Sequence, residues 1–92
     1  MEILHTDDGK KGAFKAMEEG TEAGIMTYVW AGPDKFIIDH TVGNPEFKGI
    51  GMKLLDKAVA FAREKNLKIL PLCPFAQKMF QRKPEIQDVL SQ

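Results

Sequence analysis

Apolar and polar residues alternate through the first half of the chain, and this alternation predicts β-strands. The strongest segment is Ala23–Ala31, and three more strands are expected over Glu2–Thr6, Ala13–Glu19 and Phe36–Val42. Alternation in the strongest segment separates two faces, Ile25, Thr27 and Val29 on one and Met26, Tyr28 and Trp30 on the other. Gly-, Pro- and Asp-containing turns lie between the strands, so strands two to four should form an antiparallel meander.

The spacing changes to a helical one after residue 51. A helix is predicted over Met52–Lys65, with one apolar stripe formed by Leu54, Leu55, Ala58, Phe61 and Ala62. Asn66 fits a left-handed cap at its end. The next segment, Lys68–Leu72, should be a strand parallel to Phe36–Val42, because a helix of this length makes the crossover.

Two prolines define the rest of the chain. Pro71 cannot donate to a ladder, so its strand must be an edge strand or splay away from its neighbour. Pro74 suits the first turn of a last helix, which Pro84 should stop. The expected fold is α/β (α+β), a mixed sheet in β-β-β-β-α-β-α order. With 92 residues, the chain should be one domain over 1–92.

The junction between the fourth strand and the long helix points to chemistry. Gly49 and Gly51 stand where that helix begins. Glycines there let bare backbone N–H groups approach a ligand, and the first turn carries unpaired N–H groups and the positive end of the helix dipole. This arrangement predicts a phosphate or pyrophosphate site.

Composition narrows the class of protein. The single cysteine excludes an internal disulfide, no apolar run approaches the roughly 20 residues of a membrane span, and the N-terminus lacks a signal peptide. A soluble cytoplasmic protein is therefore expected, with no membrane partner. One cysteine and two distant histidines also argue against a transition-metal site.

The net charge of zero conceals an asymmetry. Up to Glu46 the chain has four basic and nine acidic residues, and from Phe47 onward it has nine basic and four acidic. A basic half suits a polyanionic ligand and an acidic half a cationic one, although the halves could simply attract each other. Neither half has the basic density or the interleaved aromatics of a nucleic-acid surface.

The layout and two sequence stretches resemble a known family. Asp39-His40-Thr41 on the fourth strand and Leu67–Ala76, which contains Pro-Leu-Cys-Pro-Phe-Ala, are similar to the GNAT acyltransferase superfamily, and within it to the very small YjdJ-type or CG-type acetyltransferases. The likeness extends from about Phe14 to Pro84.

The resemblance implies a cofactor and its site. Acetyl-CoA or CoA would bind with its pyrophosphate at the glycine turn and its pantetheine arm between splayed strands. The implied binding residues are Thr41, Val42, Lys48, Gly49, Ile50, Gly51, Met52 and Lys53.

The glycine turn departs from the usual superfamily pattern, Gln/Arg-x-x-Gly-x-Gly/Ala, and looks two residues shorter than in this branch. Counting back from the helix places Glu46 at the Gln/Arg position, whereas aligning on Pro45-Glu46-Phe47 places Lys48 there. We prefer Lys48, because a carboxylate facing a pyrophosphate is repelled.

Two residues are candidates for catalysis. Cys73 should lie at or just before the N-cap of the last helix, where the dipole favours a thiolate. As a thiolate it could accept an acetyl group, and as a thiol it could act as a general acid toward the leaving sulfur. It could equally be a small buried hydrophobe. His40 alternates onto the face of Phe36, Ile38 and Val42, where it is either a hydrogen-bonded histidine at the sheet–helix contact or a general base. Asp39 and Thr41 should face the other way.

Two functions of different classes follow. The first is an acetyl-CoA-dependent N-acetyltransferase that acts on an amine of a small molecule or protein. The second is a CoA-binding or regulatory module that does not turn over. The sequence names neither the acceptor nor the oligomeric state.

Overall fold

The computed structural model describes residues 1–91 and contains a five-stranded sheet in the order β1-β2-β3-β4-β5. The elements are β1 (Glu2–Asp7), β2 (Lys11–Glu18), β3 (Thr21–Trp30), β4 (Lys35–Gly43), α1 (Ile50–Lys65), β5 (Lys68–Pro71), α2 (Pro74–Arg82) and the 3₁₀ helix η1 (Pro84–Val89). Strands β1 to β4 pair antiparallel, and β4 pairs parallel with β5. The predicted fold class, the meander and the parallel crossover are confirmed.

Element ends differ from the predictions by a few residues, for local reasons. Strand β2 begins at Lys11 rather than Ala13, because its ladder with β1 continues down to the Asp7–Gly12 pair. Helix α1 begins at Ile50, directly after Gly49. Its C-cap is Asn66 with a φ of 57°, as expected. The helix η1 was not predicted; Pro84 ends α2 as expected but also begins this further turn.

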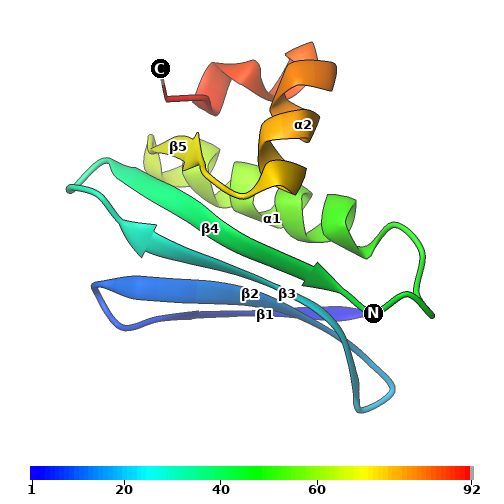
Figure 1. Cartoon of the computed structure of the whole chain (residues 1–92). Helices are drawn as coiled ribbons and strands as arrows, with labels where there is room; N and C mark the ends of the chain where they lie inside the picture. The colour runs from blue at the N-terminus through cyan, green and yellow to red at the C-terminus, as the bar shows by residue number, and fades with distance from the viewer. Residues whose placement is uncertain (92) are drawn as a thin grey trace.

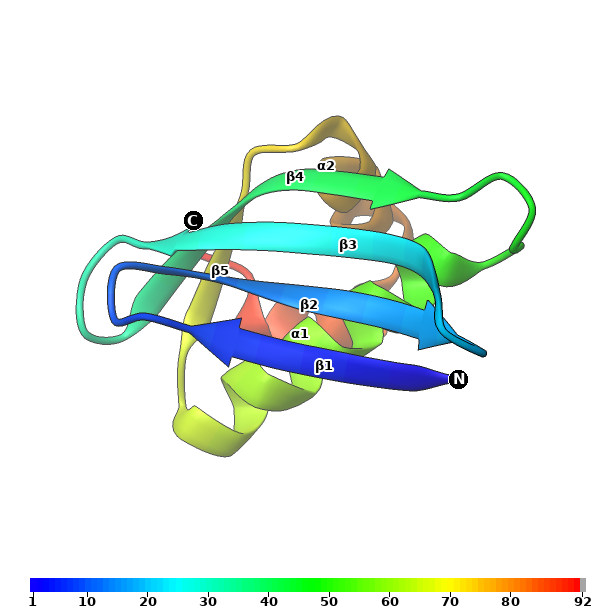
Figure 2. The same ribbon diagram turned by 90° about the horizontal axis from the view of Figure 1, so that it is seen from below.

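All three helices lie on one side of the sheet (Figure 1). Seen from the opposite side, strands β1 to β4 lie in front of α1 with no other element of residues 1–91 over them (Figure 2). We call this side the open face. No helix in the described part of the chain is long and apolar enough to cross a membrane.

The core lies between the sheet and α1. Met26 and Tyr28 of β3, which the alternation placed on one face, are buried there together with Phe36 and Ile38 of β4. The stripe of α1 meets them with Leu54, Leu55, Ala58 and Ala62, each of which is fully buried. Burying a large apolar side chain stabilises the fold by roughly 1.5–3 kcal/mol, so this contact fixes the helix on the sheet.

A β-bulge in β4 changes which side chains face the core. Thr27 pairs with His40 but the next residue, Tyr28, pairs with Ile38, so β4 has one extra residue at this point. The side chain of His40 is 78% exposed, and Thr41 contacts Cys73 on the helix side. The prediction that His40 shares a face with Ile38 while Thr41 faces away was therefore wrong, because strict alternation stops at a bulge.

Strands β4 and β5 separate at one point. Their parallel register runs from Lys35–Lys68 to Ile38–Pro71 and ends there, while β4 continues to Gly43 (Figure 2). Strand β5 is an edge strand, as Pro71 required. Beyond it, the C-terminal segment forms a bridge between Leu90 and Ile69, and the Ser91 N–H donates to the Ile69 carbonyl at 2.8 Å.

Candidate functional site

The candidate site begins where the chain leaves β5. The backbone N–H groups of Leu72 and Cys73 both donate to the Ile38 carbonyl, at 2.9 and 3.1 Å, and the chain then turns into α2. No partner strand therefore follows β4 on this side beyond Ile38 within residues 1–91. Val42 on β4 and Leu72 after β5 are 60% and 54% exposed.

The free side of β4 presents backbone hydrogen-bonding groups. The Asn44 N–H donates to the Ala23 carbonyl at 2.8 Å, and bonded and non-bonded pairs alternate in an antiparallel ladder. The alternation therefore directs Val42 toward β3 and leaves the N–H and C=O groups of Thr41 and Gly43 on the side that β5 has left. An extended ligand with amide groups could pair with them.

Cys73 lies at the near end of this gap. It is the N-cap of α2, as predicted, and its Sγ accepts the Ala76 N–H at 3.3 Å. The Thr41 Oγ1 lies 3.3 Å from the same sulfur. Cys73 is 5% exposed, so the thiol is covered yet adjacent to the strand that the gap leaves free. The structure thus brings together two of the predicted site residues, Thr41 and Cys73.

The glycine turn leads from the end of β4 into α1. Gly49 is the N-cap with a φ of 75°, and no described side chain caps this helix. The Lys53 N–H donates to the Gly49 carbonyl at 3.2 Å, so the N–H groups of the first three helical residues, Ile50–Met52, precede the first helical bond. The side chains of Lys48 and Lys53 are exposed beside them. Together these groups form an electropositive helix start suited to a phosphate.

Gly51 has a packing role that the sequence did not reveal. A Cβ on Gly51 would lie 2.6 Å from the ring of Phe75 in α2, which requires displacement of that ring. At Gly49 a Cβ would meet nothing within 4 Å, so only its positive φ calls for glycine. The absence of a side chain at Gly51 is thus explained by the contact of α1 with α2.

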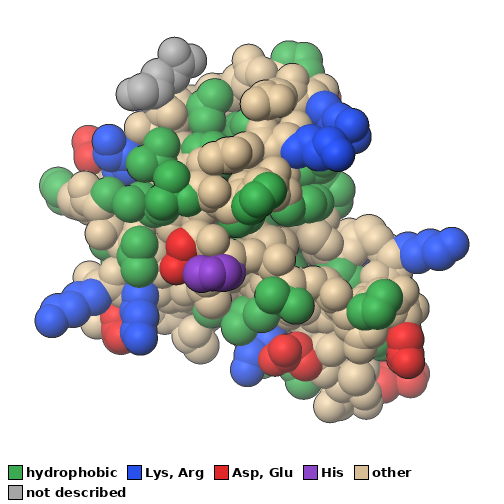
Figure 3. All heavy atoms as spheres, viewed as in Figure 1, with side chains coloured by type: hydrophobic (Ala, Val, Ile, Leu, Met, Phe, Trp, Pro, Cys, Tyr) green, Lys and Arg blue, Asp and Glu red, His purple; other side chains and the backbone are tan. Residues whose placement is uncertain are grey.

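His40 lies on the open face, apart from Cys73. Its Nδ1 is 3.5 Å from Asp39 Oδ2, and Asp39 Oδ1 accepts the Thr27 hydroxyl at 2.6 Å. Burial alone would raise the pKa of Asp39, but the Thr27 hydrogen bond and the neighbouring His40 outweigh it and hold that pKa below its usual value. Figure 3 shows a histidine beside an acidic side chain in the middle of the surface, with hydrophobic side chains above them.

The prediction of His40 at the sheet–helix contact is therefore corrected, since the bulge turns it to solvent. Sequence reasoning also missed the bond between Asp39 and Thr27, which lies across two strands and leaves no local signal. Among residues 1–91, no three His, Cys, Asp or Glu side chains gather in a way that could hold a metal ion.

Comparisons with known proteins identify the family. The family model of the GCN5-related N-acetyltransferases matches residues 13–89. A GCN5-like protein from Staphylococcus aureus, solved by NMR as a candidate N-acetyltransferase, is 32% identical to this chain and superposes with a TM-score of 0.73. The match covers 96% of this chain and 87% of the staphylococcal chain.

A ribosomal-protein-alanine N-acetyltransferase from Brucella melitensis biovar Abortus 2308 shares the fold, with a TM-score of 0.64 at 21% identity over 82% of this chain and 62% of its own. No curated protein matches the chain. On the family match and the similarity to the staphylococcal protein, the chain belongs to the GCN5-related N-acetyltransferase family.

Proposed function

We propose that this protein is an acetyl-CoA-dependent N-acetyltransferase that transfers an acetyl group to a primary amine. The family and the fold support acetyltransferase activity in general. The observation that carries the specific proposal is the separation of β4 from β5 after Ile38 and Pro71, with Thr41 and Cys73 3.3 Å apart beside it.

The cofactor would occupy two adjoining places. Its pyrophosphate would accept hydrogen bonds from the N–H groups at the start of α1, from Gly49 to Met52, with Lys48 and Lys53 nearby. Its pantetheine amides would pair with the free groups of Thr41 and Gly43 on β4. Val42 would contribute its exposed side chain rather than its backbone, which the alternation directs toward β3.

Bound acetyl-CoA would supply an activated carbonyl, on which the amine nitrogen forms an N–C bond as the C–S bond breaks and CoA leaves. Cys73 would donate its thiol proton to the departing sulfur, and the Ala76 N–H would stabilise the thiolate left behind. The proton lost by the attacking amine would pass to solvent or to His40, which is exposed on the open face. Cys73 would regain a proton from solvent after the transfer.

This function is tested with the purified protein, acetyl-CoA and a panel of primary amines, with mass spectrometry of the products and of the protein. An acetylated amine is the expected product, and acetylated Cys73 would instead assign that residue as a nucleophile. Calorimetry with CoA runs in parallel. CoA binding without acetyl transfer would support the alternative function, a CoA-binding module that does not turn over. Failure to bind CoA would overturn both functions.

The cofactor site is tested with two matched variants. Gly49→Val should weaken CoA binding about tenfold or more, because the side chain would crowd the phosphate and strain the turn. Gly20→Val is the control, since Gly20 also has a positive φ, 81°, and open space around its Cβ but lies in the β2–β3 turn. Equal affinities of the two variants would exclude the glycine turn as the phosphate site.

The sequence has a single cysteine and thus no internal disulfide, which suits a reducing compartment, and we propose that the protein acts in the cytoplasm.

A further inference from the structure

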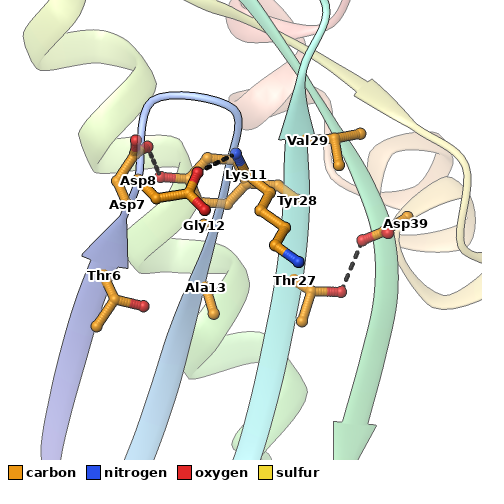
Figure 4. Close-up of a pocket in the computed structure, with 10 residues that line it drawn as sticks. All are labelled: Thr6, Asp7, Asp8, Lys11, Gly12, Ala13, Thr27, Tyr28, Val29 and Asp39. Carbon is orange, nitrogen blue, oxygen red and sulfur yellow. Dashed lines mark hydrogen bonds between the residues drawn. The ribbon is translucent and has the colours of Figure 1, made fainter.

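A hollow of about 390 Å³ lies on the open face of the sheet. Its floor is a row of small side chains, because Thr6 of β1 pairs with Ala13 of β2, which pairs with Thr27 of β3. Figure 4 shows these three side chains side by side, with Asp39 and Val29 rising at one side. The row runs across the strands, and its β4 end is Asp39.

The Asp39 end of the hollow adjoins the gap between β4 and β5. Asp39 directly follows Ile38, whose carbonyl accepts hydrogen bonds from the N–H groups of Leu72 and Cys73. The Thr27 hydroxyl fixes one carboxylate oxygen at 2.6 Å, so the carboxylate is held in the hollow rather than free to turn away. A group bound beside Asp39 on the open face is therefore next to the opening that leads to Thr41 and Cys73.

The two other carboxylates in the hollow's lining, Asp7 and Asp8, hold the β1–β2 turn through backbone hydrogen bonds. Asp7 accepts hydrogen bonds from Tyr28, Trp30 and the Gly9 N–H. Asp8 accepts the backbone N–H groups of Lys10 and Lys11 through one oxygen. In Asp39 the Oδ1 atom accepts the Thr27 hydroxyl, and the Oδ2 atom faces the exposed His40 imidazole at 3.5 Å. A cation from solvent could therefore bind Oδ2 in place of, or beside, His40 without breaking a backbone hydrogen bond.

The chain's own Lys11 shows which cation fits. Its side chain extends along the hollow, with the ammonium group directed toward Thr27 (Figure 4). A primary alkylammonium group on a flexible methylene chain therefore already lies in the hollow that Asp39 also lines. The acceptor of an N-acetyltransferase has the same chemical form before it loses its proton.

We propose that this hollow binds the acceptor amine as an alkylammonium ion, with Asp39 as its anion and Lys11 as the side chain that it displaces. This inference rests on the proposed function and names the substrate class for it. The hollow is wide and open, so the alkylammonium group could belong to a linear polyamine or to a lysine of a polypeptide.

Steady-state kinetics with both kinds of amine test the assignment. Asp39→Asn keeps an oxygen for the Thr27 hydroxyl but removes the charge, so KM for the amine should rise tenfold or more while KM for acetyl-CoA stays the same. Lys11→Met should lower KM for the amine several-fold. The controls are Asp34→Asn, in the β3–β4 turn, and Lys15→Met, on the same strand and face but paired with Glu22 outside the hollow.

A binding measurement separates this inference from the proposed function. NMR titration with 1,5-diaminopentane, and separately with an end-blocked peptide carrying one lysine, should shift the amide signals of Thr6, Ala13 and Thr27. The ligand with the larger response identifies the source of the amine. Signal shifts without acetyl transfer would refute the proposed acetyltransferase function but leave the amine site in the hollow. Acetyl transfer with an unchanged KM for the amine in Asp39→Asn would refute the amine site but leave the acetyltransferase function.

Discussion

At the scale of single residues, Cys73 combines a structural and a chemical task. Its sulfur caps α2 through the Ala76 N–H and lies beside Thr41. Alanine at this position should cost about 1 kcal/mol of stability through the lost cap, whereas serine should retain the cap. Both variants should lose acetyl transfer if the thiol is the proton donor, and a Cys73→Ser variant with full transfer would remove it from the mechanism.

The reactivity of Cys73 gives a second measure of the same site. Because the thiol lies next to the proposed path of the pantetheine arm, we expect a small reagent to alkylate it more slowly with CoA bound than without it. Mass spectrometry of the labelled protein over time measures this. Equally slow labelling in both conditions would mean that Cys73 only packs.

His5 and Asp7 should make stability fall in acid in two steps. Burial lowers the pKa of His5, so its protonation opposes folding and stability is lost as the pH falls below about 6.5 through the folded pKa. Burial would raise the pKa of Asp7, but hydrogen bonds, that of Tyr28 foremost, lower it overall, so its contribution holds above about pH 4 and disappears below.

Urea unfolding between pH 7 and pH 3 resolves the two contributions. His5→Gln should flatten the profile between about pH 7 and 5, and Asp7→Asn should flatten it below about pH 4. What is compared is the slope against pH, because either change also alters packing. Slopes identical to those of the unmodified protein would show that neither group drives the acid transition.

At the scale of elements, the approach of α1 to α2 depends on the pair Gly51 and Phe75. Gly51→Ala should destabilise the protein by about 1–3 kcal/mol, because its Cβ would overpack against the ring 2.6 Å away. Phe75→Leu should recover part of that loss in the double variant. Chemical denaturation of the four proteins measures the coupling, and strictly additive effects would show that the two residues do not constrain each other.

Most elements could be predicted because their signals are local. The stripe of Leu54, Leu55 and Ala58 and the alternation around Tyr28 follow burial within a few residues of chain. Asn66 indicates a helix end through its own left-handed backbone conformation. The bulge could not be predicted, since it depends on the register between β3 and β4. That one irregularity reversed the expected faces of His40 and Thr41.

The site was predictable to a similar degree. The position of Cys73 between a strand end and Pro74 indicated its role, and the position of the glycine turn before a helix indicated the phosphate site. The contact of Gly51 with Phe75 and the bond of Asp39 with Thr27 join distant segments. Such contacts leave no pattern in the sequence.

At the scale of the whole molecule, the two halves of the charge asymmetry belong to different parts of the fold. The acidic half forms β1 to β4, and the basic half forms β5 and the helices. The proposed polyanionic cofactor would thus meet the helical side, and the proposed cationic acceptor the acidic sheet. Long-range attraction would draw each substrate to its own side.

This separation predicts a salt dependence. The Kd for CoA should rise as the salt concentration increases from about 0.05 to 0.5 M, because screening weakens attraction to the basic side. Acetyl-pantetheine, which carries no phosphate, should bind with much less salt dependence and serves as the control. Parallel salt curves for the two ligands would show that charge on the helical side does not contribute to cofactor binding.

The extra residue in β4 has a consequence for how such an opening could be gained or lost in evolution. A bulge bends its strand and increases the local twist, and here it lies directly after the last pair with β5, Ile38 and Pro71. Deletion of Asp39 would leave His40 and Thr41 facing as they do but straighten the strand. The insertion or deletion of one residue could therefore open or close the gap between β4 and β5. In the deletion variant, protection of the Thr41 and Gly43 amides from hydrogen exchange would show that the gap had closed.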